Sequence, residues 1–242
     1  MFSVVIPAYN EEKTINKCLD SLVRQKTNTP FEVIVVDNNS TDGTQKVVKE
    51  FQNRLNPPIR RVNLKLITEN KKGRGAARAT GFKVAKGEII FSTDADTQVS
   101  ESWLERLSSY FKDKNTVVVT GPVKIKNCSF FFNCFYNFFE PILSFIYHLI
   151  FGHFLFVGSN CAVRKTAYLK INGFDRRLTS MEDVDLGFQL RKIGKIKFAR
   201  GISVITSGRR FENKPFAGIL FYFKEFFQYF FFNKESYLNN KR

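Results

Sequence analysis

The chain has 242 residues and a mass of 28.1 kDa, and its apolar and charged fractions of 43% and 25% exclude a disordered or fibrous protein. With 38 Lys and Arg residues against 22 Asp and Glu residues, the formal charge of +16 favours an anionic partner: a nucleic acid, an acidic lipid surface or a phosphorylated substrate. Four scattered cysteines without CxxC spacing argue against a disulfide scaffold or a zinc site. The first residues show no secretory signal pattern, so we expect a cytoplasmic location with reduced thiols.

The first half of the chain alternates short apolar runs with helical patterns. Strands are predicted over 2–6, 31–36, 64–68, 88–92 and 117–120. Helices are predicted between them, over 11–25, 42–51, 73–85 and 101–111. Nearly continuous apolar strands separated by helices indicate an α/β protein with a mostly parallel sheet that helices cover on both faces.

Polar side chains follow three of the predicted strands. Tyr9 and Glu11 follow the first strand, Asp37 follows the second, and Asp94 and Asp96 follow the fourth. Parallel sheets bind ligands beyond the carboxyl ends of their strands, so we expect these side chains to converge on one rim. Two carboxylates so close together repel each other unless a cation lies between them, and their oxygens suit Mg²⁺ or Mn²⁺ shared with substrate phosphates.

The second half of the chain is expected to extend the same domain. A strand is predicted over 158–164, a helix with an acidic N-terminus over 182–192 and a strand over 202–206. Internal repeats and linker-like segments are not evident. We therefore expect one domain over 1–215, followed by an aromatic tail over 216–242 that lies at a membrane interface.

Two blocks, 130–157 and 216–232, hold 22 of the 37 aromatic residues. The run ILFYFKEFFQYFFF in the second block is too short to span a bilayer, which needs about 20 apolar residues. Amphipathic helices lying in the membrane plane, with Phe buried and Lys224 outward, fit better, and the positive charge favours docking to anionic lipid. A buried aromatic core or a homodimer face is the alternative.

The order of the motifs resembles that of the family-2 glycosyltransferases. The motifs are VIPAYNEE, DNNSTDGT, GRGAARATG, DAD and GFDRRLTSMEDVDL, and the resemblance covers about residues 1–210. It implies the Rossmann-like GT-A fold, with a nucleotide-sugar half over 1–125, an aromatic insertion over 129–157 and an acceptor half over 158–210.

The resemblance also implies roles for single residues. Those expected at the nucleotide sugar are Pro7, Tyr9, Glu11, Asp37, Arg74, Arg78 and Asp94. Asp37 would read the base edge, and Asp96, together with Asp94, would hold Mg²⁺ or Mn²⁺ on the pyrophosphate. Asn38 stands where many relatives have a second Asp, which leaves the identity of the base open.

The later motifs imply the catalytic groups. In MEDVDL, Asp183 is the candidate general base for an acceptor hydroxyl, with Glu182 as its orienter or substitute. In SGRRF, Arg209 and Arg210 would stabilise the departing diphosphate. The alternatives are an acidic helix N-terminus and a basic loop near a membrane.

Together these features predict an inverting glycosyltransferase that moves one sugar from a nucleotide diphosphate sugar to a glycan or lipid-linked acceptor. We expect it on the cytoplasmic side of an anionic membrane surface, peripheral or in-plane, with one inserted hairpin as an alternative, and we expect no nucleic-acid partner. A polyprenyl-phosphate sugar synthase is the nearest alternative, but its ionised phosphate acceptor would need no base. The alternatives from other classes are a nucleotidyltransferase and a basic, non-catalytic membrane or nucleic-acid binder.

Overall fold

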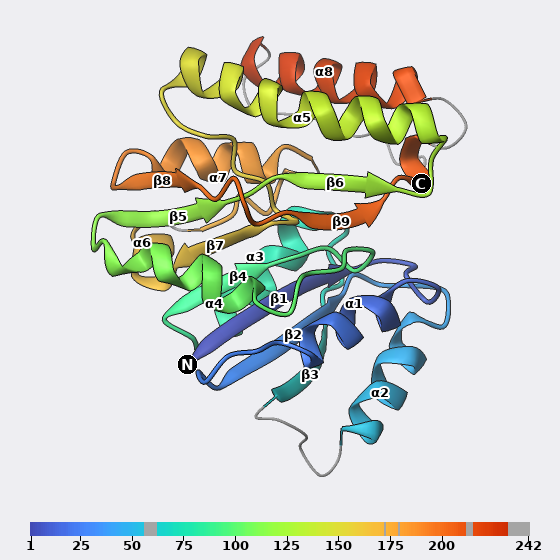
Figure 1. The fold of residues 1–242 in the computed structure, drawn as a ribbon. Coiled ribbons are helices and arrows are strands. Elements are labelled where there is room, and N and C mark those ends of the chain that lie inside the picture. Colours follow the sequence, from blue (N-terminus) through green and yellow to red (C-terminus); the bar gives the residue numbers. More distant parts are fainter. Residues whose placement is uncertain (56–61, 172, 179, 212–214, 232–242) are drawn as a thin grey trace.

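The described part of the chain forms a seven-stranded sheet with strand order β3-β2-β1-β4-β7-β5-β8 and a separate two-stranded sheet, β6-β9 (Figure 1). The computed structural model describes residues 1–55, 62–171, 173–178, 180–211 and 215–231, without the side chains of 210, 215–219 and 222. The strands are β1 (Phe2–Ala8), β2 (Phe31–Asp37), β3 (Val62–Thr68), β4 (Ile89–Ser92), β5 (Thr116–Thr120), β6 (Val123–Lys126), β7 (Cys161–Arg164), β8 (Lys195–Phe198) and β9 (Val204–Ser207).

Helices cover both faces of the large sheet. They are α1 (Ile15–Val23), α2 (Thr44–Arg54), α3 (Arg74–Val84), α4 (Trp103–Ser108), α5 (Phe130–Phe151), α6 (Lys165–Lys170), α7 (Glu182–Leu190) and α8 (Pro215–Phe231), with 3₁₀ turns η1 (Ser109–Lys112) and η2 (Arg209–Phe211). Apolar residues of α1, α2 and α4 pack on one face, and those of α3, α6 and α7 pack on the other. The predicted two-sided α/β sheet is confirmed.

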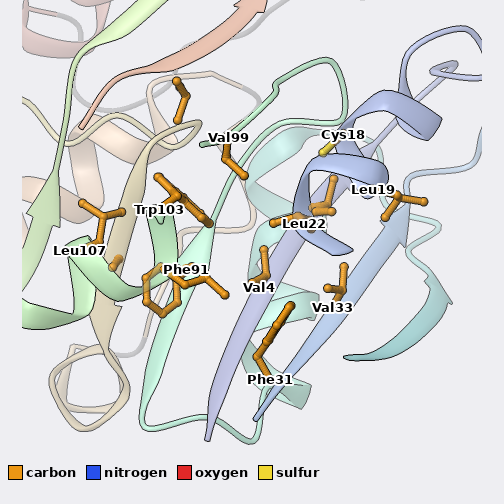
Figure 2. Packing of buried hydrophobic residues seen from close by; sticks show 14 of the residues in the cluster. Val4, Cys18, Leu19, Leu22, Phe31, Val33, Phe91, Val99, Trp103 and Leu107 are labelled. Carbon is orange, nitrogen blue, oxygen red and sulfur yellow. The ribbon is translucent and has the colours of Figure 1, made fainter. Parts of the chain in front are cut away.

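The alternation of side chains along the strands explains why the apolar runs are continuous. Val4 and Val33 face the cluster that contains Phe91 and Trp103 (Figure 2), whereas the next residue along β1, Val5, faces the opposite cluster. Successive side chains of a strand point to opposite faces, so a strand covered on both faces needs apolar residues at every position.

Strand β1 continues through Pro7 to Ala8, although the sequence predicted its end before Pro7. The pairing of β1 with β4 stops at Val5, while its pairing with β2 continues to Ala8. Pro7 therefore lies beyond the last paired residue of β4, where a missing N–H removes no bond to that strand.

The structure also contains short elements that the sequence did not predict: β6, β8 and α6, of four, four and six residues. Strand β7 is antiparallel to both of its neighbours, β4 and β5, so the sheet is mostly but not wholly parallel. Segments of four residues contain too little periodicity to be distinguished from a loop, and only pairing with β5 or β9 defines them.

Helices α5 and α8 lie side by side as an outer layer at the top of the view in Figure 1. Their inner faces carry polar groups. The Asn137 side chain donates to and accepts from the backbone of Ile125, and Ser144, Glu225 and Tyr229 are buried. The exposed apolar residues are Phe130, Phe131, Phe135, Phe138, Phe139, Ile142, Leu143, Phe145, Ile146, Leu149 and Ile150 on α5, and Leu220, Phe221, Phe223, Phe227, Phe230 and Phe231 on α8.

The aromatic insertion and the predicted tail thus form one layer on the domain. Helix α8 packs on α7 through a cluster that includes Met181, Val184, Phe226 and Tyr229. Residues 232–242 of the predicted tail lie outside the described residues. Helix α5 is the one helix in the described part of the chain whose length and hydropathy would suffice to cross a bilayer.

Candidate functional site

A pocket opens beyond the carboxyl ends of β1, β2 and β4. Its lining residues are Pro7, Ala8, Tyr9, Glu11, Asn38, Arg74, Ala77, Asp94, Ala95, Asp96 and Arg209. Of the five residues expected at the rim, Tyr9, Glu11, Asp94 and Asp96 line this pocket, whereas Asp37 does not. Arg209 joins them from a distant part of the sequence. The individual roles predicted for these residues stay predictions.

One arginine, Arg209, contacts two carboxylates of the pocket, those of Glu11 and Asp96. The guanidinium of Arg209 forms an ion pair with Glu11 and lies 3.4 Å from Asp96 Oδ2. The hydroxyl of Thr206 donates to Asp96 Oδ1 at 2.9 Å. Burial, and next the nearby carboxylates of Asp94 and Glu11, raise the pKa of Asp96.

Burial is the largest cause of this raised pKa, and the Asp94 and Glu11 carboxylates add negative charge beside Asp96 that a divalent cation would relieve. The described residues contain no group of three or more His, Cys, Asp or Glu side chains placed to hold a metal ion. A cation bound mainly by substrate phosphates needs only one or two carboxylates from the protein. Asp94 and Asp96 therefore fit Mg²⁺ or Mn²⁺ in that shared arrangement.

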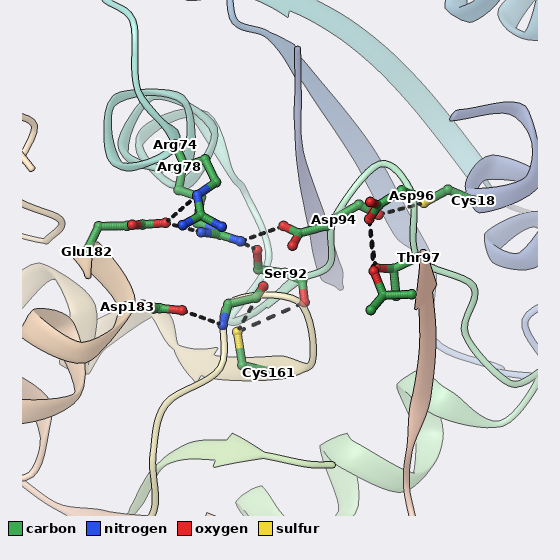
Figure 3. Close-up of polar contacts among 12 residues, drawn as sticks. Cys18, Arg74, Arg78, Ser92, Asp94, Asp96, Thr97, Cys161, Glu182 and Asp183 are labelled. Carbon is green, nitrogen blue, oxygen red and sulfur yellow. Dashed lines mark hydrogen bonds and ion pairs between the residues drawn. The ribbon is translucent and has the colours of Figure 1, made fainter. Parts of the chain in front are cut away.

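Arg78 links Asp94, in the pocket, to α7. Its guanidinium forms ion pairs with Asp94 Oδ1, at 2.6 Å, and with Glu182 (Figure 3). Arg74 Nε lies 3.7 Å from the same Glu182 carboxylate. Arg78 and Glu182 are fully buried, where each charge requires its partner. Arg78 is not among the pocket-lining residues, so its predicted contact with the nucleotide stays a prediction.

Gly158 makes room for this buried arginine. A Cβ atom at Gly158 would come within 2.5 Å of Arg78 Cζ, closer than side chains pack. Any larger residue would displace the guanidinium from Asp94 and Glu182. The sequence offered no sign of this role, because the two residues meet only in the folded chain.

Asp183 is the acidic residue of α7 best placed to exchange a proton. It is half-buried, and its Oδ2 accepts a hydrogen bond from the Gly158 N–H at 3.2 Å (Figure 3). Burial, and then the Glu182 carboxylate, raise its pKa, which Arg78 and Arg74 partly oppose. A raised pKa brings a carboxylate closer to the working range of a general base. Glu182 is buried and ion-paired with Arg78, so it is less able to take up a proton. This arrangement agrees with the predicted orienting role of Glu182 better than with the role of the base.

Asp37 is fully buried beside the pocket and is not among its lining residues. Its Oδ2 accepts hydrogen bonds from Ser40 N and Gln45 Nε2, at 3.2 and 2.8 Å. Its Oδ1 has no hydrogen-bond partner among the described residues. A buried carboxylate oxygen left unpaired is costly, so Oδ1 is suited to accept an N–H from a ligand.

Asn38, at the position where the family resemblance led us to expect an Asp, forms hydrogen bonds to the loop that leads into α3. Its amide nitrogen donates to Glu69 O at 2.9 Å and to Lys71 O at 2.7 Å, and its amide oxygen accepts from Gly73 N. An ionised Asp could not donate to these carbonyl groups. The structure thus gives the departure a local reason.

Two further residues complete the placement of the predicted site. Thr206, which supports Asp96, was missed because it lies 110 residues further along the chain. Arg210 lies in η2, but its side chain is outside the described part of the structure, so its predicted role stays a prediction.

Comparison with known sequences identifies the family. The sequence model of the family described as "Glycosyl transferase family 2" matches residues 3–171. Poly(ribitol-phosphate) beta-N-acetylglucosaminyltransferase TarS of Staphylococcus aureus is 30% identical over 185 residues, which are 75% of this chain and 31% of TarS. Glycosyltransferase AglE of Haloferax volcanii is 36% identical over 124 residues, 50% of this chain and 39% of AglE. The chain thus spans less than half the length of these relatives.

Solved structures show the same fold. TarS 1–349 of S. aureus in complex with UDP-GlcNAc has a TM-score of 0.64 at 23% identity, over 86% of this chain and 58% of that one. Mannosyltransferase PcManGT of Pyrobaculum calidifontis, in complex with GDP-Man and Mn²⁺, has a TM-score of 0.63 at 22% identity, over 84% and 56% of the two chains. The seven-stranded α/β domain therefore has the GT-A type of fold, and the chain belongs to glycosyl transferase family 2.

Proposed function

We propose that the protein transfers one sugar, with inversion, from a nucleotide diphosphate sugar to a membrane-associated glycan or lipid-linked acceptor. The observation that carries the proposal is the pairing of two acidic sites through Arg78: Asp94 in the pocket and Glu182 next to Asp183. Relatives named as glycosyltransferases, and similar structures that contain UDP-GlcNAc or GDP-Man, support this type of substrate.

The pocket, and the buried Asp37 beside it, offer partners for the base and the diphosphate of the donor. The unpaired Oδ1 of Asp37 can accept an N–H from the base. Arg74 and Arg209 line the pocket and can bind the diphosphate through charge-assisted hydrogen bonds. Asp96 and Asp94 would hold the divalent cation, which supplies positive charge to the diphosphate as it leaves.

Asp183 supplies the proton acceptor in this proposal. The acceptor hydroxyl gives its proton to the Asp183 carboxylate as its oxygen bonds to the anomeric carbon of the sugar. The bond from that carbon to the phosphate oxygen breaks at the same time, and the nucleoside diphosphate leaves with the electron pair. A single displacement of this kind inverts the anomeric centre. Glu182, through Arg78, keeps α7 in place beside Asp94.

The membrane part of the proposal is supported by the inverted polarity of α5 and α8. Both helices turn polar residues such as Asn137 and Glu225 toward the protein and expose their Phe, Ile and Leu side chains. Water-facing helices show the opposite arrangement, whereas a lipid surface favours this one. With a formal charge of +16, the protein is suited to an anionic surface, which we place on the cytoplasmic side.

The test of the proposed reaction is a panel of UDP- and GDP-sugars incubated with the full chain and Mn²⁺, with release of nucleoside diphosphate as the readout. Water can replace the acceptor, so slow hydrolysis of at least one donor is expected. A preparation that binds neither UDP nor GDP by calorimetry and hydrolyses no donor would contradict the proposal. That result would favour the basic, non-catalytic binder.

A polyprenyl-phosphate sugar synthase remains the second candidate. The motifs shared with the family favour it equally, but an ionised phosphate acceptor would need no proton acceptor, which is the role proposed here for Asp183. The two reactions differ in their response to Asp183→Asn, which would spare transfer to a phosphate and remove transfer to a hydroxyl.

A further inference from the structure

Helix α8 is joined by two buried hydrogen bonds to the segment that carries the proposed base. Ser180 Oγ donates to Glu225 Oε2 at 2.6 Å, and Tyr229 OH donates to Asp185 Oδ1 at 2.7 Å. Ser180 comes three residues before Asp183, and Asp185 comes two residues after it. The two bonds therefore bracket the base along the chain.

The start of α7 depends on such outside support. Met181 precedes the helix with φ of 56°, in the left-handed region that bulky residues avoid, and its own side chain makes no capping hydrogen bond; within the helix, Asp183 Oδ1 accepts from the first-turn Val184 N–H at 3.0 Å. Met181 and Val184 instead pack against Tyr229, with Phe226 and Phe188 at the edge of the cluster. Contacts with α8 thus add to the Arg78–Glu182 ion pair in fixing the first turn of α7.

The polar residues of α8 are otherwise unexpected. Glu225 and Tyr229 are one helical turn apart and buried, on a helix whose outer face is almost wholly apolar. Burying a carboxyl group without a partner would be costly, and each of these residues has its partner on the segment around α7. Glu225 and Tyr229 therefore connect α8 to α7 and to the residue just before it.

We infer that Glu225 and Tyr229 are positioning residues: from α8 they fix the first turn of α7 and so hold the Asp183 carboxylate at the reacting centre. The inference rests on the proposed function, because it takes Asp183 as the base. Helix α8 would then have two roles. Its inner face supports the proposed site, and its outer face is the apolar surface described above.

The test compares two buried phenols in the full-length protein. Tyr229→Phe removes the hydroxyl that bonds to Asp185, whereas Tyr147→Phe removes a buried hydroxyl that has no hydrogen-bond partner among the described residues. A misplaced catalytic group can cost about 10²-fold in rate, so we expect Tyr229→Phe to lower kcat for hydrolysis of the best donor about 10- to 100-fold. The Kd for the matching nucleoside diphosphate with Mn²⁺ should stay unchanged, and Tyr147→Phe should retain kcat.

Glu225 offers a rescue experiment. Glu225→Gln keeps an oxygen that can accept the hydrogen bond from Ser180, so this variant should retain most of kcat. Glu225→Ala lacks that oxygen, so its kcat should fall about as much as that of Tyr229→Phe. Hydrogen exchange of the amides in 182–186 should be faster in Tyr229→Phe than in Tyr147→Phe. This readout does not depend on activity.

The outcomes separate the inference from the proposed function. A Tyr229→Phe protein with a lower Tm but unchanged kcat would mean a merely structural role and would overturn the inference. If the wild type hydrolyses no donor, the proposed function fails, and the hydrogen exchange of 182–186 decides whether α8 fixes α7. Equal exchange in Tyr229→Phe and wild type would overturn the inference as well.

Discussion

The acidic residues of the site differ in how their charges are balanced. Asp96 and Glu11 share the guanidinium of Arg209, and the pKa of Asp96 is raised. Both features agree with the proposed role of Asp96 as a ligand of the cation on the diphosphate. Glu182 is neutralised by the buried Arg78. Asp183 is half-buried, and its Oδ2 and Oδ1 accept hydrogen bonds from the backbone N–H groups of Gly158, at 3.2 Å, and Val184, at 3.0 Å. Unlike Glu182, it is not ion-paired with an arginine in the described part of the chain, which leaves its carboxylate able to take up a proton.

Replacing Asp96 by Ala should remove the cation-dependent part of donor binding while the fold stays intact, because a carboxylate at the pocket rim contributes little to packing. Calorimetry with UDP or GDP, with and without Mn²⁺, measures this. Glu50→Ala, which removes an exposed carboxylate on α2, is the matched control and should bind as wild type does. An unchanged dependence on Mn²⁺ in Asp96→Ala would contradict the assignment.

The raised pKa of Asp183 predicts how the reaction depends on pH. Its carboxylate accepts a proton only when ionised, so kcat should fall as the pH falls through the raised pKa. We expect the acidic limb of the kcat profile, at saturating donor and Mn²⁺, to lie above the ordinary aspartate value of about 3.9. A limb at or below that pH would show that Asp183 is not the group being titrated.

At this scale the sequence predicted which residues gather at the rim, but not how each one is paired. The ends of the predicted strands were enough to predict that Glu11, Asp94 and Asp96 lie close together, and all three line one pocket. The ion pair between Arg78 and Glu182 joins residues 104 positions apart, and no local pattern in the sequence encodes it. The burial of Asp37 likewise depends on contacts with neighbouring segments.

The sequence predicted the helices and strands that are long and have a clear apolar pattern. It did not predict several of the short ones, which become regular only by pairing with or packing on their neighbours. Strand β2, with seven buried residues, contains the apolar run VIVV at 33–36, which sufficed to predict a strand. Strands β6 and β8 and helix α6 become regular only through their neighbours. For α8, composition predicted an amphipathic helix, but not that its polar side faces the protein, because the direction of a face depends on what packs against it.

The outer face of α8 provides the membrane test. Leu220, Phe223, Phe227 and Phe231 are exposed, and burying one Phe in an apolar phase contributes about 1.5–3 kcal/mol. Replacing these four residues by Ser should release the protein from anionic vesicles in sedimentation assays and leave hydrolysis of a soluble donor nearly unchanged.

The control for this test is a residue on the inner side of the same helix. Phe226 packs in the cluster between α7 and α8, so Phe226→Ser should lower the stability of the fold without releasing the protein from vesicles. A wild-type protein that stays unbound to vesicles but forms a dimer in solution would instead assign the apolar layer to a dimer interface.

For the molecule as a whole, Arg78 connects three parts of the chain. It belongs to α3, pairs with Asp94 after β4 and pairs with Glu182 at the start of α7, and Gly158 leaves the space for it. The segment after β4 and the start of α7 thus share one buried cation. This arrangement makes the geometry of the site a property of the whole domain.

Breaking this link should destabilise the protein. Arg78→Met leaves the Glu182 carboxylate buried without its partner, which typically costs about 3–5 kcal/mol in the free energy of unfolding. The double variant Arg78→Met with Glu182→Gln removes the unpaired charge and should recover part of that loss. Urea unfolding measures both variants, and equal stabilities of the single and double variants would contradict the pairing.

The central claim, that Asp183 takes a proton during sugar transfer, is tested most directly by one rate measurement. Nucleoside diphosphate release is followed for wild type and Asp183→Asn at saturating donor and Mn²⁺, with the donor identified by the panel. Asn preserves the shape of the side chain but cannot accept the proton, so the rate should fall by roughly 10²–10⁴-fold while donor affinity stays near that of wild type. A variant that retains most of the wild-type rate would contradict the account.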